Sequence, residues 1–142
     1  MAPRAVPFLA QRLRPVPRVE EERLTRLIAD LDSPRFGVRS RAAKELEQLG
    51  ELAEPGLRKA LASKPTPETR RQLTMLLDQV GSRPLSSEQL HVLRGVEVLE
   101  QTGTSGARQV LKVLTTGAPE ARLTREAKAS LERLAGRDTP KP

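Results

Sequence analysis

The chain has 142 residues, no cysteine and a formal net charge of +7. The absence of cysteine excludes disulfides, thiolate catalysis and cysteine-rich metal sites. No apolar run approaches the roughly 18 residues of a membrane span, and the N-terminal stretch lacks the long apolar region of a secretory signal. We therefore expect a cytoplasmic protein that has no membrane contact.

Composition and periodicity favour an all-α protein. Phe8 and Phe36 are the only aromatic residues, so the core must consist of Leu, Val and Ala, as in tightly packed helices. Apolar positions recur with helical spacing, and strand signals are missing throughout. We expect helices over residues 7–13, 20–31, 34–49, 53–61, 67–80, 86–102, 104–115 and 120–135.

Proline and capping residues mark the boundaries of these helices. The twelve prolines are expected at helix starts or in connections, and none inside a helix. Ser33 is expected to cap the helix that begins at Pro34, and Thr66 is expected to cap the helix that begins at Pro67. Ser86 followed by Gln89 has the spacing of a capping box.

One helical cassette recurs four times along the chain. Its three-residue frames are Ala42, Leu46 and Leu49; Leu73, Leu77 and Val80; Gly95, Leu99 and Thr102; and Ala127, Leu131 and Leu134. Offsets of 31, 22 and 32 residues separate the copies, as in stacked helical units that cannot bury an apolar face alone. We therefore expect equivalent burial of the central leucines, which are Leu46, Leu77, Leu99 and Leu131.

The third copy lies in a strongly apolar segment. Its apolar residues are Leu90, Val92, Leu93, Val96, Val98 and Leu99. A helix that is apolar nearly all round is a buried helix, so we expect this one to form the centre of the domain.

The first copy, with the helix before it, resembles a HEAT-like repeat of the PBS-lyase type. The matching residues are Leu24, Leu27, Ile28, Leu31, Asp32, Val38, Arg39, Ala42, Ala43, Leu46, Leu49 and Gly50. The resemblance implies a helical superhelix in which Asp32 and Arg39 have the structural role of the Asp and Arg ladder of HEAT stacks. The second copy departs from the pattern, with Thr69-Arg70 in place of Val-Arg and Leu73 in place of the first alanine.

A narrower resemblance spans nearly the whole chain. The segments 5–13, 27–33, 53–61 and 118–127 carry it. They are similar to a helical region found at the C-terminal end of many planctomycete WD40-repeat proteins. The resemblance implies an accessory helical module beside a propeller, and it brings no catalytic residues. The chain contains no propeller repeat, so we expect an excised fragment or a stand-alone copy.

These patterns together predict the fold and its organisation. The fold class is all-α, a short right-handed α-α superhelix (HEAT-like solenoid) of about seven to eight helices. Residues 1–18 are expected to form a short helix and a Pro/Arg-rich arm, residues 19–136 the HEAT-like helical domain, and residues 137–142 a disordered tail.

No catalytic signature accompanies the helices. His91, the only histidine, is expected to be structural or solvent-facing, because further ligands at helical spacing are missing. Glu97 and Glu100 could imitate a catalytic pair, but a solvated or salt-bridged edge explains them better. Gly103–Gly106 has the form of a KH-domain clamp without the flanking strands, so a helix stop followed by a cap is the better interpretation. We predict a non-enzymatic protein with no metal or cofactor.

Charge is the one feature that indicates a partner. Six basic residues on the last two helices could form one surface: Arg108, Lys112, Arg122, Arg125, Lys128 and Arg133. We predict that this surface contacts an acidic protein or a neighbouring domain, so that the chain is a protein-protein interaction or scaffolding module; no small-molecule substrate is indicated. A nucleic-acid-binding solenoid is the alternative, and a merely solvated surface the third interpretation.

Overall fold

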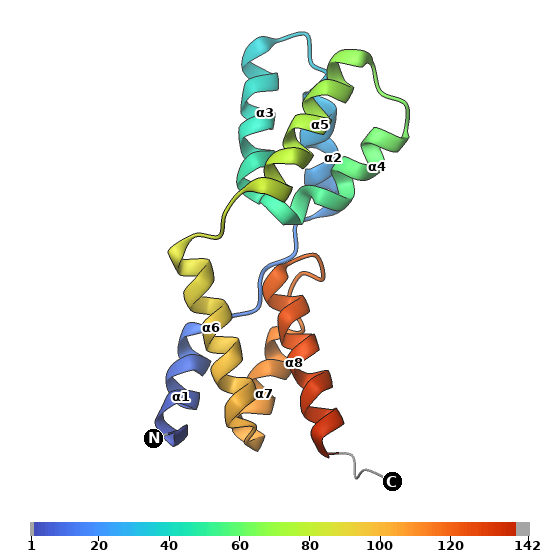
Figure 1. Ribbon diagram of the computed structural model, residues 1–142. Coiled ribbons are helices and arrows are strands. Elements are labelled where there is room, and N and C mark those ends of the chain that lie inside the picture. The colour runs from blue at the N-terminus through green and yellow to red at the C-terminus, as the bar shows by residue number, and fades with distance from the viewer. Residues whose placement is uncertain (1, 139–142) are drawn as a thin grey trace. The chain divides into compact units, whose positions relative to one another are not determined.

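The computed structural model describes residues 2–138. These residues form helices and no strand, so the prediction of an all-α protein is confirmed (Figure 1). The α-helices are α1 (Ala2–Arg12), α2 (Glu21–Asp30), α3 (Phe36–Leu49), α4 (Glu54–Ala62), α5 (Pro67–Ser82), α6 (Ser87–Thr102), α7 (Ser105–Leu114) and α8 (Arg122–Asp138). A short 3-10 helix, η1 (Gly50–Ala53), joins α3 to α4.

The helices group into two compact units. Unit 1 contains the residues up to Pro17 and those from Leu85 onward, with α1, α6, α7 and α8. Unit 2 contains Arg18–Pro84, with α2 to α5, and is therefore an insertion between the first and later helices of unit 1. Each unit has an apolar core of its own. The helical domain predicted over residues 19–136 contains α2 to α7 and α8 up to residue 136, whereas α8 continues to Asp138.

Unit 2 consists of two helical hairpins packed side by side. The helices α2 and α3 form one hairpin and α4 and α5 the other, while α2 contacts α4 and α3 contacts α5 between them. Its buried core residues are Leu27, Leu31, Ala42, Leu46, Ala53, Leu57, Leu73 and Leu76. Gly56 allows the close approach of α4 to α2, because a Cβ atom there would lie 2.5 Å from Leu24 Cδ2.

Unit 1 is arranged around α6, which contacts α1, α7 and α8. Its buried core residues are Leu13, Val96, Leu99, Ala107, Leu111, Leu114, Ala127 and Leu134. The segment after α1 is tied to the α7–α8 connection, since Ala118 N donates a hydrogen bond to Val16 O at 2.8 Å. Gly117 makes this approach possible, because a Cβ atom there would lie 2.7 Å from Val16 N.

The predicted caps are present at three helix starts. Thr66 Oγ1 accepts a hydrogen bond from the first turn of α5, and Ser86 and Gln89 form the predicted capping box of α6. Gly103 ends α6 with a φ of 63°, a left-handed conformation that favours glycine, and Thr104 then caps α7. The interpretation of Gly103–Gly106 as a helix stop followed by a cap is therefore confirmed.

Two helix starts in the first part of the chain differ from the prediction. Pro7 lies inside α1, which begins at Ala2, so this proline removes one internal hydrogen bond instead of starting the helix. The third helix begins at Phe36, with Arg35 as its N-cap residue. Ser33 Oγ accepts a hydrogen bond from Arg35 N at 3.2 Å, so Ser33 and Pro34 close a turn before the helix.

Two later helices end beyond their predicted limits. The helix α5 continues through Gly81 to Ser82, whose hydroxyl donates to Asp78 O at 2.8 Å. The helix α8 begins at Arg122 and extends to Asp138, which pairs with Arg108 of α7. Arg137 is therefore helical, and the rest of the predicted tail, residues 139–142, lies outside the described residues.

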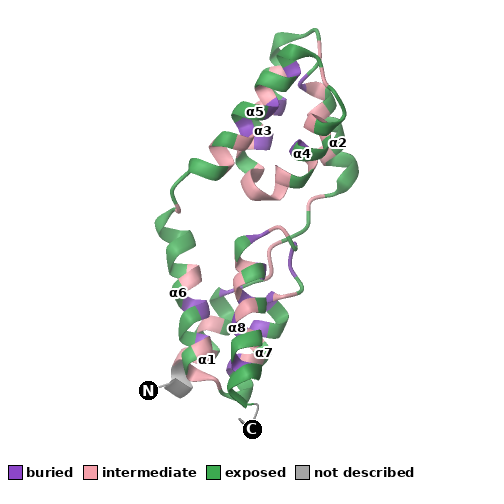
Figure 2. Ribbon diagram, turned by 45° about the vertical axis from the view of Figure 1, so that its right-hand side comes forward, coloured by how far each residue is buried: buried purple, intermediate pink, exposed green. Residues whose placement is uncertain are grey.

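Buried, intermediate and exposed residues alternate along the helices (Figure 2), and burial divides the four cassette leucines into two kinds. Leu46 is 1% exposed and Leu99 is 0% exposed, as predicted. Leu77 and Leu131 are only partly buried at the edges of their cores, so the prediction of equivalent burial is wrong for them. In α5 and α8 the residue one position earlier, Leu76 or Ser130, is buried instead, because packing against neighbouring helices sets the rotation of each helix about its axis.

The expectation that α6 is buried all round is also wrong. Val96 and Leu99 face the core, whereas Leu90 is 41% and Val98 is 39% exposed. The neighbouring helices α1, α7 and α8 cover only part of the surface of α6. The helix is thus central in its contacts within unit 1 without being enclosed.

Candidate functional site

Arg108 and Arg133, which belong to the six basic residues predicted to bind a partner, form ion pairs between the helices of unit 1. Arg108 on α7 donates through Nε to Gly103 O at 3.0 Å and pairs with Asp138 on α8. Arg133 on α8 pairs with Glu100 on α6, with 2.6 Å between Nη2 and Oε1. Both arginines therefore hold α8 in place.

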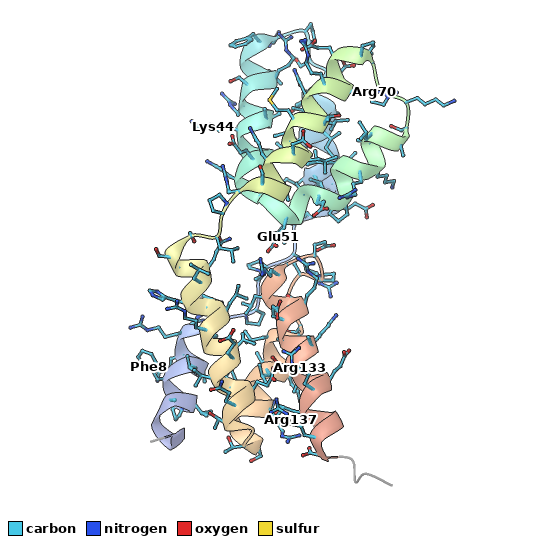
Figure 3. All side chains as sticks on the ribbon, in the orientation of Figure 1. Phe8, Lys44, Glu51, Arg70, Arg133 and Arg137 are labelled. Atoms are coloured by element: carbon cyan, nitrogen blue, oxygen red, sulfur yellow. The ribbon has the colours of Figure 1, made fainter. Side chains whose placement is uncertain are left out.

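Glu100 is the centre of this ion-pair cluster. Arg137 Nη2 approaches its second carboxylate oxygen at 3.1 Å, and Figure 3 shows Arg133 and Arg137 on the same helix. The Glu100 side chain is only 13% exposed. The hydrogen bond from Arg133, aided by Ser130 and Arg137, lowers the pKa of Glu100 from 4.5 to about 2 against the opposing effect of burial. The predicted salt-bridged edge is thus confirmed for Glu100.

The other four predicted residues lie on the exposed surface of α7 and α8. Arg122, Arg125 and Lys128 follow one another at three-residue spacing along α8, and Lys112 is exposed on α7. Arg122 and Arg125 already have interaction partners. The cluster predicted from sequence therefore divides into two structural arginines, an exposed strip on α8 and the separate Lys112 on α7.

The remaining sequence candidates have positions that suit structural or solvated roles. His91 is exposed on α6, and the described residues contain no group of three His, Asp or Glu side chains placed to hold a metal ion. Asp32 Oδ1 accepts a hydrogen bond from Thr69 Oγ1 at 3.1 Å, and Arg39 Nη1 donates to Ser33 O at 2.7 Å. Arg39 thus holds the α2–α3 turn, whereas Asp32 ties this turn to the first turn of α5.

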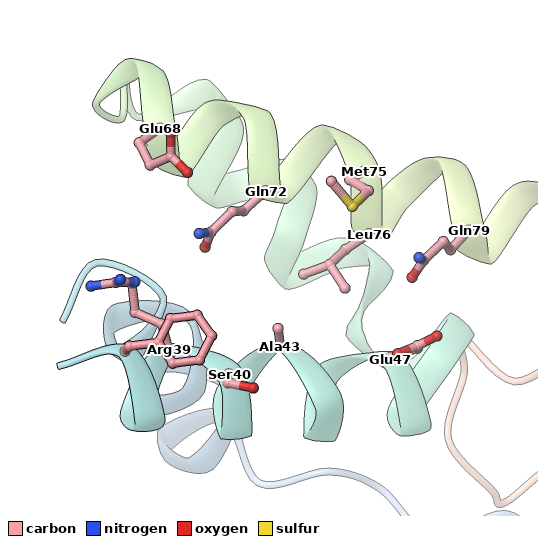
Figure 4. Close-up of a pocket in the computed structure, with 10 residues that line it drawn as sticks. Arg39, Ser40, Ala43, Glu47, Glu68, Gln72, Met75, Leu76 and Gln79 are labelled. Atoms are coloured by element: carbon pink, nitrogen blue, oxygen red, sulfur yellow. The ribbon is translucent and has the colours of Figure 1, made fainter. Parts of the chain in front are cut away.

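A groove between α3 and α5 is the site that sequence reasoning missed. It lies within unit 2 and has a volume of about 360 Å³ (Figure 4). Its lining residues are Phe36, Arg39, Ser40, Ala43 and Glu47 on α3, and Glu68, Gln72, Met75, Leu76 and Gln79 on α5. The lining positions of α3 lie on a different face from its buried Ala42 and Leu46.

The groove combines exposed apolar side chains with small residues. Phe36 is 75% exposed and Met75 is 53% exposed, although both are large and apolar. Ser40 and Ala43 are short, so α3 leaves open space opposite these two side chains. The Arg39 guanidinium lies 5.8 Å from the centre of the Phe36 ring. The only sequence signal for this site is a phenylalanine outside the leucine stripe of its helix.

Polar groups line both ends of the groove. Glu68 lies in the first turn of α5, and Glu47 lies near the end of α3. Arg83 approaches Glu47 at 3.1 Å, and Arg71 approaches Glu68 at 3.9 Å. Figure 4 shows the amides of Gln72 and Gln79 directed from α5 toward α3. The Oε1 atom of each amide is buried and has no hydrogen-bond partner.

Comparisons with protein-family models, with curated proteins and with solved structures give no match to this chain. The resemblances to HEAT-like repeats and to WD40-associated helical regions therefore stay hypotheses. Among the described helices, none combines the length and apolar character needed to cross a membrane.

Proposed function

We propose that this chain is a non-enzymatic, HEAT-like helical-repeat module that binds another protein, as a scaffold or as an accessory to a WD40 propeller. The observation that carries the proposal is the open α3/α5 groove with its exposed Phe36 and Met75. Large apolar side chains gathered in a concave surface are typical of sites that a partner covers.

The packing of unit 2 supports the repeat architecture in this proposal. Its two hairpins contact each other through their first helices, α2 and α4, and through their second helices, α3 and α5. Neighbouring units of a helical solenoid pack in this way, and the faces of successive helices then form a continuous binding surface. The groove lies between two such second helices.

The exposed basic strip on α8 favours a second candidate function, binding to nucleic acid. Arg122, Arg125 and Lys128 share one exposed face within a chain of net charge +7. Reversing all three to glutamate should then abolish binding to duplex DNA or RNA, and binding by the parent should weaken steeply with salt. Undiminished binding by the reversed variant would exclude this strip.

Site-specific photo-crosslinking tests the proposed protein interaction. A photoreactive phenylalanine analogue replaces Met75 in the groove and, as a matched control, Val113, which is 45% exposed on α7. We expect position 75, and not position 113, to form a discrete adduct in cells of the source organism. That adduct should be degraded by protease and weakened by Phe36→Ser. No adduct, or an adduct degraded by nuclease, would contradict the proposal.

A further inference from the structure

We infer that the α3/α5 groove binds a basic amphipathic helix of a partner protein. The apolar side chains of the partner helix would contact Phe36 and Met75, and its lysine or arginine side chains would lie at both ends of the groove. The inference rests on the proposed function and specifies the chemistry of the partner.

The walls of the groove favour a helical occupant over an extended one. Both walls are α-helices, α3 and α5, whose backbone N–H and C=O groups bond within each helix. An extended peptide would therefore find few main-chain partners there, whereas a helix satisfies its own backbone and presents only side chains. An apolar helix face can then pack against Phe36 and Met75.

The dimensions of the groove suit about three turns of such a helix. The lining positions extend from residue 36 to 47 on α3 and from residue 68 to 79 on α5. At 1.5 Å of rise per residue, each wall is about 16 Å long. The two helices run alongside each other with Glu68 at one end and Glu47 at the other (Figure 4).

The charge of the lining selects a basic partner. Glu47 and Glu68 lie at opposite ends of the groove, and Arg39 is the only cationic residue in its lining. Arg39 is already engaged by Ser33 O. With two glutamates and one arginine, the lining has one net negative charge in a chain whose net charge is +7. The arginines beside the two carboxylates form exposed pairs, which are weak, so a partner can compete with them.

The two unpartnered glutamine oxygens indicate the same chemistry independently. Gln72 and Gln79 are seven residues apart and therefore lie on one face of α5, two turns from each other. Their Oε1 atoms need hydrogen-bond donors. Lysine and arginine side chains are donors only, whereas Asp and Glu carboxylates are acceptors only, so of the charged side chains only those of a basic helix can donate to these two oxygens once the amides turn toward the groove.

Two cross-linked helical peptides of about four turns provide the test. They share one leucine face and differ only in their flanking residues, which are lysine in one and glutamate in the other. We expect the lysine peptide to bind the full chain about tenfold more tightly in fluorescence anisotropy. It should also shift the amide NMR signals of α3 and α5. Equal affinities, tighter binding of the glutamate peptide, or shifts confined to unit 1 would overturn the inference.

Charge reversal in the groove supplies the matched comparison. The double variant Glu47→Lys, Glu68→Lys should invert the preference between the peptides. Glu22→Lys with Glu54→Lys makes the same charge change on α2 and α4 outside the lining and should leave the preference unchanged. Circular dichroism checks that both variants are folded. An unchanged preference in the groove variant would overturn the inference.

Crosslinking from position 75 separates this inference from the proposed function. Protein adducts at that position, combined with no preference for the lysine peptide, would overturn the basic helix alone. The absence of any protein adduct would overturn the proposed function.

Discussion

The two units have similar leucine-rich cores, but the contacts between their helices at the surface differ. In unit 1, Arg133 joins α8 to a largely buried glutamate of α6, and Arg108 joins α7 to the end of α8. In unit 2, the second helices of the two hairpins leave a groove open, and Phe36 and Met75 stay exposed in it.

This difference shows that residue type alone is a poor guide to the binding surface, for basic residues and for apolar residues alike. The arginines of the C-terminal helices suggest a binding surface, yet Arg108, Arg133 and Arg137 form ion pairs between helices of unit 1. Phe36 near the start of α3 and Met75 in the middle of α5 are large apolar residues that suggest core, yet both are exposed. A partner site is therefore better sought where apolar side chains remain uncovered than where basic residues are most frequent.

The largest expected effect tests whether the two cores are separate. Leu46→Ala and Leu99→Ala each remove a fully buried leucine, from unit 2 and unit 1 respectively. Each should lower the free energy of unfolding by about 2 to 5 kcal/mol in urea denaturation. Hydrogen exchange should accelerate mainly in α2 to α5 for Leu46→Ala and mainly in α1 and α6 to α8 for Leu99→Ala.

The partly buried cassette leucines provide the control for that experiment. Leu77→Ala and Leu131→Ala should each cost less than their fully buried counterparts, because part of each side chain is already exposed to water. Uniform acceleration of exchange through all helices in either fully buried variant would contradict the separation into two cores.

A smaller effect, dependent on pH, should distinguish the ion pairs of the two units. Arg133 lowers the pKa of Glu100 to about 2, below its ordinary value of 4.5. The ionised carboxylate therefore contributes stability above pH 4.5 that disappears as the pH falls toward 2. Glu100→Gln should lower the free energy of unfolding by about 1 to 2 kcal/mol at pH 7, measured in urea.

The exposed Glu54–Arg58 pair of unit 2 is the comparison for Glu100. It joins two residues of one helix, with Nη2 of Arg58 at 2.7 Å from Oε1 of Glu54. Glu54→Gln should change stability by about 0.5 kcal/mol or less at pH 7. The stabilities of Glu100→Gln and the parent should converge in acid; a difference that stays constant from pH 7 to pH 3 would refute the role given to the carboxylate.

The features predicted correctly from sequence depend on neighbouring residues in the chain. The caps at Thr66, Ser86 and Thr104 use hydrogen bonds to backbone groups three positions away, so the local sequence contains all their partners. The stop at Gly103 likewise depends on the φ of one residue. Pro7 was misplaced because a single lost hydrogen bond does not prevent a helix from continuing past it.

The features that sequence reasoning missed depend on distant residues. The rotation of α5 and α8 that leaves Leu77 and Leu131 partly exposed is set by packing between helices. Arg133 meets a glutamate 33 positions earlier in the chain. The groove exists because nothing in unit 2 covers Phe36 and Met75, and no local pattern specifies which helix face stays uncovered.

The smallest expected change in stability gives the sharpest test of the contrast between the units. Phe36 is 75% exposed, and its cation-π contact with Arg39 is on the surface, so Phe36→Ala should cost only about 0.5 kcal/mol in urea denaturation. The same variant should weaken binding of the lysine-flanked peptide about tenfold, because the side chain forms the apolar wall that the partner helix covers. A loss of stability as large as that of Leu46→Ala, with peptide binding unchanged, would make Phe36 part of the fold of unit 2. The two units would then differ only in their packing, and the surface of unit 2 would have no binding role in the α3/α5 groove.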